Sequence, residues 1–181
     1  METILFTSGR DDWETPDSLM AVLRREFLFG AEFGLDPCAT AEAKKGVEFY
    51  GPGSPLCEDG LSLPWFAETA FVNPPFGKDR DPKILSAWIE KCYREVAEGH
   101  VRLVVALLPV RTDRKVWHDY VFPYATEIRF LKGRVRFLRD GVPFTSATFP
   151  SAVVVWERGK LGWGRSGPWD WRKEAKEWAG L

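Results

Sequence analysis

A short apolar run near the middle of the chain ends in Asn73-Pro74-Pro75-Phe76. Prolines lack a backbone N–H and fix φ, so a β-strand cannot continue through Pro74 and Pro75. A residue before proline takes extended geometry, which fixes Asn73 at the carboxyl end of that strand. A side-chain amide, a carbonyl and a flat ring are therefore held together on one stiff turn. Such a turn is suited to binding a planar group that carries an NH₂.

A second strand of the same kind is expected at residues 33–35, where the chain continues into Asp36-Pro37. The carboxyl ends of parallel strands in an open α/β sheet form the edge where ligands bind. Asp36 and Asn73 are therefore expected at the same edge. Asp36 could accept a hydrogen bond from an amine or hydroxyl of a ligand, or it could be a turn-forming Asp-Pro. Asp59 leaves the same choice, because it precedes Gly60.

The best candidate for a central parallel strand is a nearly continuous apolar run at residues 101–108, which ends at Pro109. Three basic residues follow it, namely Arg111, Arg114 and Lys115. They lie at or beyond the carboxyl end of the predicted strand. They could contact phosphate groups there, or they could form a solvated face.

Two helices are expected to flank these strands. The first has Thr15 as its N-cap, Pro16 at its first helical position, apolar residues at helical spacing and an end at Gly30. On these signals alone, the segment that contains Thr15 and Pro16 could be a plain capped helix entry. The second helix begins near residue 81, has one apolar face and ends near residue 99.

The other segments predict shorter elements: a helix at 40–45, a strand at 47–50, a helix after Thr112, a strand pair at 127–131 and 134–138, a turn at Asp140-Gly141 and a strand at 151–156. Short strands without a helix between them predict an antiparallel closure at one edge of the sheet. The tail, residues 159–181, begins Gly-rich and ends in a short polar helix pattern. Packing against the core is the favoured role for this Trp-rich tail.

Composition favours an ordinary globular protein. The 181 residues suffice for one domain with a full core, and the net charge of -1 argues against strong nonspecific binding of nucleic acid across the whole surface. A local basic groove is compatible with that sum. Three cysteines without a Cys-x-x-Cys or histidine cluster predict a reduced, cytoplasmic protein without a metal site. No signal peptide or membrane-spanning run is recognised, and no oligomeric state is indicated.

Taken in order, the motifs resemble those of the small phage and prophage DNA adenine methyltransferases, which use S-adenosylmethionine. The resemblance covers residues 12–156 of a single predicted domain, 1–181, and leaves 157–181 outside. It rests on Trp13-Glu14-Thr15-Pro16, Leu35-Asp36-Pro37-Cys38-Ala39, Asn73-Pro74-Pro75-Phe76, Leu108-Pro109-Val110-Arg111-Thr112-Asp113 with Trp117-His118-Asp119-Tyr120, Gly133-Arg134-Val135-Arg136-Phe137 and Phe149-Pro150-Ser151-Ala152.

The resemblance implies an α/β, Rossmann-like methyltransferase fold: a mostly parallel sheet with a terminal antiparallel strand and helices on both faces. S-adenosylmethionine would lie across the carboxyl ends of the first strands, with no metal. The resemblance assigns its binding to Trp13, Thr15, Pro16, Asp36, Pro37 and Asp59. Asp36 would lie near the methionine ammonium and Asp59 near the adenine of the donor. One departure stands out, since Pro37-Cys38-Ala39-Thr40 replaces the glycine-rich turn usual after the first strand.

The resemblance also implies how the turn after Asn73 works. The Asn73 side-chain oxygen and the Pro74 carbonyl would bind the two hydrogens of an exocyclic amine, whose lone pair then becomes available to attack the methyl group. Pro75 stiffens the turn, and Phe76 would stack on the base, contributing ~1–3 kcal/mol. A base in a duplex must be flipped out to reach such a site. Arg111, Lys115 and Arg134 are the candidates for phosphate contacts to DNA.

Several alternatives remain at this stage. The acceptor could be another planar amine or amide, namely cytosine, an RNA adenine or a protein glutamine. The chain could also be a catalytically silent Rossmann-like binding protein. Adenine in DNA is favoured because Asn, not Ser, opens the motif, and because the chain is too short for a separate protein-docking domain. The setting implied by the resemblance is a bacterial or phage-infected cell and restriction–modification.

Overall fold

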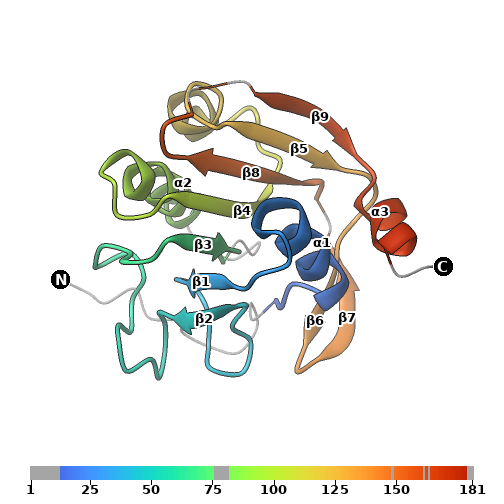
Figure 1. Ribbon diagram of the computed structural model, residues 1–181, viewed down its shortest axis with the longest axis horizontal. Helices are drawn as coiled ribbons and strands as arrows, with labels where there is room; N and C mark the ends of the chain where they lie inside the picture. Colours follow the sequence, from blue (N-terminus) through green and yellow to red (C-terminus); the bar gives the residue numbers. More distant parts are fainter. Residues whose placement is uncertain (1–12, 76–81, 148, 161, 163, 179–181) are drawn as a thin grey trace.

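The computed structural model describes residues 13–75, 82–147, 149–160, 162 and 164–178. Its centre is a seven-stranded sheet with the strand order β2-β1-β3-β4-β8-β5-β9 (Figure 1). Strand β8 runs antiparallel to both of its neighbours, and the other paired strands are parallel. The strand bounds are β1 Phe33–Asp36, β2 Gly46–Phe49, β3 Thr69–Val72, β4 Leu103–Pro109, β5 Glu127–Leu131, β8 Ser151–Glu157 and β9 Arg165–Trp169. The prediction of a mostly parallel sheet with one antiparallel strand is confirmed.

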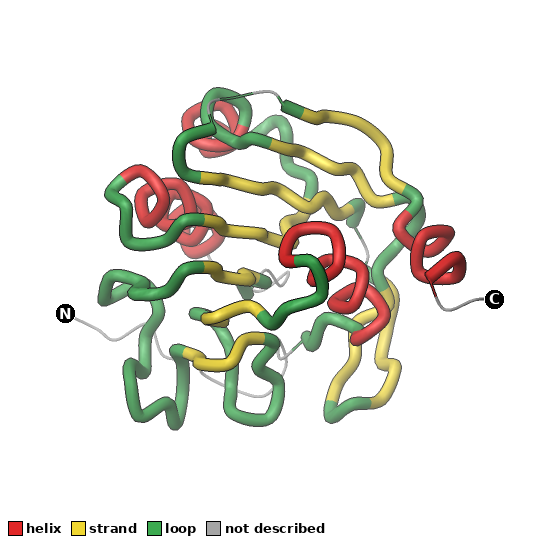
Figure 2. Tube along the Cα trace, in the orientation of Figure 1, coloured by secondary structure: helices red, strands yellow, loops and turns green. Residues whose placement is uncertain are grey.

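Helices cover both faces of this sheet (Figure 2). On one face, α2 (Pro82–Ala97) and a short π-helix, η1 (Trp117–Val121), enclose an apolar cluster. On the other face, α1 (Asp17–Leu28) and α3 (Trp171–Trp178) enclose a second cluster, which also receives side chains from the hairpin β6 (Arg136–Arg139) and β7 (Val142–Ser146). All seven residues of β4 are buried. The apolar run therefore does form a central strand covered on both faces.

Two expectations about the strands are wrong. Residues 127–131 and 134–138 do not pair with each other, because β5 joins the main sheet while β6 pairs with β7 in a separate hairpin. The turn at Asp140-Gly141 is correct and closes that hairpin, with φ of 50° and 72° at its two residues. The antiparallel strand β8 lies inside the sheet, between β4 and β5, instead of at an edge.

Three expectations about helices also need correction. Residues 40–45 form turns instead of a helix. The helix after Thr112 exists but takes the π form, in which the Phe122 N–H reaches the Trp117 carbonyl at 2.8 Å. Helix α1 begins one residue later than predicted, with Pro16 at the N-cap and no side-chain cap. The Thr15 hydroxyl, predicted to cap this helix, is buried without a partner.

The tail packs against the core, as favoured from the sequence. Strand β9 extends the sheet in parallel beside β5, and Trp169 and Trp171 are buried against α1. The Arg172 guanidinium donates hydrogen bonds to the backbone carbonyls of Lys132 and Arg134. The tail thereby fastens the turn that leads from β5 into the hairpin.

In the described part of the chain, no helix is long and apolar enough to cross a membrane. The three cysteines are free, and the described residues hold no group of three or more His, Cys, Asp or Glu side chains that could bind a metal ion.

Candidate active site

The chain contains one asparagine and no glutamine, so Asn73 supplies its only side-chain amide. Strand β3 ends at Val72, and Asn73 follows at the carboxyl edge of the sheet. The Asn73 Nδ2 donates a hydrogen bond to the Trp13 carbonyl at 2.9 Å. This bond fixes the orientation of the amide, because a carbonyl can only accept. The amide oxygen, Oδ1, therefore points elsewhere.

The Asn73 Oδ1 is buried and has no hydrogen-bond partner. An unsatisfied buried acceptor costs about 1–3 kcal/mol, so such atoms are rare in folded proteins. The adjacent Pro74 carbonyl accepts no hydrogen bond from a described residue either. Two acceptors on adjacent residues of this turn thus have no donor among the residues that the structure describes. Pro75 ends the described part of this turn, and Phe76 lies outside the described residues.

Asp36 lies at the carboxyl end of β1, the strand next to β3, and is buried. Its Oδ1 accepts a hydrogen bond from the Cys38 N–H at 3.3 Å, and its Oδ2 accepts one from the Lys45 N–H at 3.0 Å. Burial raises the pKa of Asp36 to about 6, against the lowering effect of these two hydrogen bonds. Asp36 is thus both a turn residue and a buried carboxylate at the ligand edge.

Cys38 connects Asp36 to Asn73, a role that no motif of the sequence indicated. Its thiol lies 3.8 Å from the Asp36 Oδ1 and also receives a hydrogen bond from the Asn73 backbone N–H. Burial, followed by the nearby Asp36 charge, raises the pKa of the Cys38 thiol well above its ordinary value. The thiol is therefore neutral, and it acts as a spacer that keeps the ends of β1 and β3 together.

The turn after β1, which replaces a glycine-rich turn, is closed off by a neighbouring loop. A Cβ atom on Gly60 would lie 1.8 Å from the Pro37 carbonyl oxygen, so only glycine fits there. Next to it, the Asp59 Oδ1 accepts a hydrogen bond from the Leu61 N–H at 3.0 Å. The structure therefore brings Asp59 beside the turn that carries Asp36 and Pro37. One of the two Asp59 carboxylate oxygens, Oδ1, is therefore engaged within its own loop.

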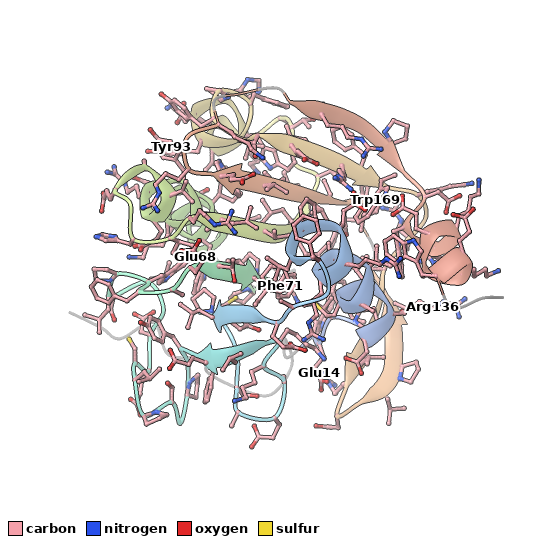
Figure 3. The ribbon with its side chains drawn as sticks, viewed as in Figure 1. Glu14, Glu68, Phe71, Tyr93, Arg136 and Trp169 are labelled. Carbon is pink, nitrogen blue, oxygen red and sulfur yellow. The ribbon has the colours of Figure 1, made fainter. Side chains whose placement is uncertain are left out.

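Trp13 and Glu14 connect Asn73 to the β6–β7 hairpin. The Glu14 backbone exchanges two hydrogen bonds with Leu138 of strand β6, at 3.0 and 2.9 Å. The Trp13 ring packs against Phe137 and Phe149, with centroids 5.3 and 6.2 Å away. Figure 3 shows Glu14 on the side of the molecule that carries the hairpin. The segment that begins at Trp13 is thus held by the hairpin and, in turn, holds the Asn73 amide.

One basic side chain contacts this aromatic cluster, and two others lie on the same hairpin segment as Phe137. The Arg111 guanidinium lies 5.9 Å from the Phe149 ring centroid, and Arg134 and Arg136 lie at the base of the hairpin. All three are exposed, and none has an acidic partner in the described part of the chain. Lys115, in contrast, pairs with Asp119 at 2.5 Å. Arg136 was not among the candidates from the sequence, although it belongs to the same alternating segment as Arg134.

Comparison with known protein families settles the family. The family described as DNA N-6-adenine-methyltransferase (Dam) matches residues 2–160. The chain belongs to this family. A comparison with individually curated proteins gave no match.

Membership of the Dam family makes the chain a DNA adenine methyltransferase, with S-adenosylmethionine as methyl donor and DNA as substrate. The sheet and its covering helices are accordingly a Rossmann-like methyltransferase fold, as the resemblance implied. The matched region extends a little beyond the predicted 12–156 and ends before β9 and α3. The strand and helix of the tail therefore lie outside the part shared with the family.

Proposed function

We propose that this Dam-family chain methylates the exocyclic amine of an adenine that is flipped out of DNA and held by Asn73, Pro74 and Phe76. The observation that carries the proposal is the Asn73 Oδ1, a buried acceptor without a partner. The amide is oriented by its bond to the Trp13 carbonyl, so the acceptor stands ready before substrate arrives. Keeping such an atom unsatisfied is costly, which favours a role in binding a ligand.

The chemistry follows from what the two acceptors do to an aromatic amine. Its lone pair is delocalised into the ring, which makes the amine a poor nucleophile. Hydrogen bonds from its two N–H groups to the Asn73 Oδ1 and the Pro74 carbonyl favour a pyramidal nitrogen with a localised lone pair. The rigid turn supplies this geometry in advance, so catalysis is mostly positioning. Phe76 would stack on the base.

The donor side of the site is assigned to Trp13, Thr15, Pro16, Asp36, Pro37 and Asp59. S-adenosylmethionine supplies an electrophilic methyl group. Asp36 fits a cationic ligand, because its pKa is raised by burial and a positive partner would offset that cost. It also adjoins Asn73 through Cys38, as the transfer requires. Trp13 has less support than Asp36 as a donor contact, since its ring packs toward Phe137 and Phe149.

Arg111, Arg134 and Lys115 are proposed as phosphate contacts that position DNA over the site. Arg111 and Arg134 have no acidic partner among the described residues, so their charge is available to DNA. Lys115 is a weaker candidate because Asp119 already neutralises it. Arg136 is added to Arg111 and Arg134 as a candidate, because it is exposed and stands at the start of β6, two residues after Arg134.

The decisive experiment is transfer of a tritiated methyl group from S-adenosylmethionine to duplex DNA, followed by nucleoside analysis. Label in N6-methyldeoxyadenosine is expected. Label in methylcytosine alone, or in protein, would contradict the proposed acceptor. A second reading comes from NMR, because Asn73 gives the only side-chain amide NH₂ signals of the chain. Those two signals are expected to shift when adenine-containing DNA binds, and unchanged signals would contradict the clamp.

A further inference from the structure

Ser151 opens strand β8, and its hydroxyl is buried without a hydrogen-bond partner. Only 2% of the residue is exposed. Buried serine hydroxyls usually bond to nearby backbone, and unpaired ones are rare in folded proteins. Like the Asn73 Oδ1, this hydroxyl is a polar group that the chain itself leaves unsatisfied.

The strand register places the Ser151 side chain on the same face of the sheet as the Asn73 side chain. Val153 pairs with Leu107, and both side chains pack in the apolar cluster under α1 and α3. Ser151 pairs with Pro109, two residues further along the same strands. Side chains two residues apart on a strand share a face. Phe71 packs in the same cluster, and Asn73 follows it by two residues. The Asn73 and Ser151 side chains therefore lie on one face of the sheet.

The register also gives the separation of the two residues. Val72 pairs with Ala106, so Asn73 stands level with Leu107 on β4 and Val153 on β8. Ser151 therefore lies two strands across from Asn73 and two residues further toward the carboxyl edge of the sheet. Strand spacing and rise then put the two Cα atoms about 12 Å apart. Two short polar side chains can span this distance with one purine hydrogen-bonded between them.

Neighbouring contacts fix the beginning of β8 beside the site. The Pro150 carbonyl accepts a hydrogen bond from the Val110 N–H at 2.8 Å, which holds this corner against the end of β4. Phe149 lies nearly parallel to the Trp13 ring, with 7° between the planes. Since the Trp13 carbonyl holds the Asn73 amide, Ser151 and Asn73 belong to one connected group of residues.

The strand order decides which ligand Ser151 faces. Asp36, assigned to the donor, lies on β1 on one side of β3. Ser151 lies on β8, on the opposite side of β3, beyond β4. The hydroxyl is therefore on the side of the methyl acceptor, away from the donor.

We propose that the Ser151 hydroxyl donates a hydrogen bond to a ring nitrogen beside the amine of the target adenine. The inference rests on the proposed function, because it assumes that Asn73 holds that amine. Adenine has an acceptor on each side of its amine, N1 and N7, whereas cytosine has one, N3, and a C–H on the other side. A donor at this position selects a base with an acceptor beside its amine, and it makes Ser151 discriminate adenine from cytosine when the contacted nitrogen is N7.

The test pairs Ser151→Ala with DNA substrates whose target base is adenine, 1-deazaadenine or 7-deazaadenine. Ser151→Ala is expected to lower kcat/KM on adenine by about tenfold, the effect of one hydrogen bond. On the analogue that lacks the contacted nitrogen, kcat/KM of the wild-type protein should fall by a similar factor relative to adenine. The kcat/KM of Ser151→Ala should be the same on that analogue as on adenine. The analogue that shows this coupling identifies the nitrogen.

The matched control is Thr126→Val, which removes a buried hydroxyl that bonds near the far end of β8. The Thr126 Oγ1 donates to the Val155 carbonyl at 3.0 Å. This variant should lose thermal stability and keep the wild-type ratio between adenine and its analogues. Ser151→Ala, which removes an unpaired group, should keep its melting temperature.

The outcomes separate the two proposals. Suppose that the wild-type protein is active. If Ser151→Ala then lowers kcat/KM by the same factor on all three substrates, or does not lower it at all, the role of Ser151 is overturned and the proposed function stands. Absence of transfer to adenine by the wild-type protein would overturn the proposed function and this inference together.

Discussion

The two sides of the site differ in how their buried polar groups are satisfied. On the β1 side, both oxygens of Asp36 accept hydrogen bonds from backbone N–H groups of this chain. On the β3 and β8 side, Asn73 Oδ1 and Ser151 Oγ are buried without partners. The Asp36 carboxylate is satisfied by the protein itself, whereas the Asn73 Oδ1 and the Ser151 Oγ lack the partners that a ligand would supply.

This difference bears on how each side should respond to mutation. Groups that the chain satisfies contribute to folding, so their loss should affect stability and donor binding together. Groups that the chain leaves unsatisfied cost stability, so their removal should impair activity without unfolding the protein.

The largest effect is expected from Asn73→Ala. Loss of a positioned hydrogen-bonding group in an active site typically lowers kcat by about 10²–10³. The same change removes one hydrogen bond to Trp13 and one unsatisfied acceptor, so the free energy of unfolding should stay the same or rise. Methyl-transfer rates and urea unfolding measure the two quantities. A large drop in stability would mean that Asn73 is mainly structural.

Gly60→Ala tests the side that the chain completes. The new Cβ would lie 1.8 Å from the Pro37 carbonyl oxygen and 2.9 Å from the Trp88 ring, so the loop must move. Overpacking of this kind typically costs about 1–3 kcal/mol of unfolding free energy. Gly167→Ala is the matched control, because nothing lies within 4 Å of its added Cβ. Equal stability of the two variants would contradict the close contact between this loop and the turn after β1.

Asp36 should make donor binding depend on pH. The pKa of its carboxyl is about 6 in the unliganded protein, and a bound ammonium would lower that pKa. Binding then requires loss of a proton below pH 6, so affinity should be constant above about pH 7 and fall by up to about tenfold per pH unit below 6. Calorimetric titration of S-adenosylmethionine between pH 5 and 8 measures this. Asp36→Asn should bind more weakly and lose the dependence.

The smallest effect concerns the basic residues. Arg111→Ala should weaken DNA binding a few-fold and reduce the dependence of log K on log salt by about one unit, as expected for one phosphate contact. Lys115→Ala should change both less, because Asp119 pairs with that lysine. Binding measured across a range of salt concentrations compares the two variants. A larger change for Lys115→Ala would reverse the ranking.

The sequence alone predicted the elements whose signals are local. The paired prolines after Asn73 and the proline after Asp36 correctly placed the ends of β3 and β1, because proline stops a strand wherever it occurs. The buried run of β4 and the amphipathic α2 were found for similar reasons. Asp36 and Asn73 were correctly expected at one edge, since both strands are parallel neighbours.

Pairing between distant segments could not be predicted in this way. The two alternating segments between residues 127 and 138 could pair with each other or with other strands. Only packing assigned β5 to the sheet and β6 to a hairpin. The contact of Glu14 with Leu138 depends on that assignment.

The turn chemistry and spacing of Asn73-Pro74-Pro75-Phe76 determined by themselves that a stiff amide would stand at a strand end. The direction in which that amide faces depends on the packing of the chain, because the carbonyl that orients it belongs to Trp13, sixty residues earlier. Local sequence sets backbone geometry through sterics. The partners of a buried polar atom are set by which distant segments pack around it, and here that packing left its oxygen unpaired.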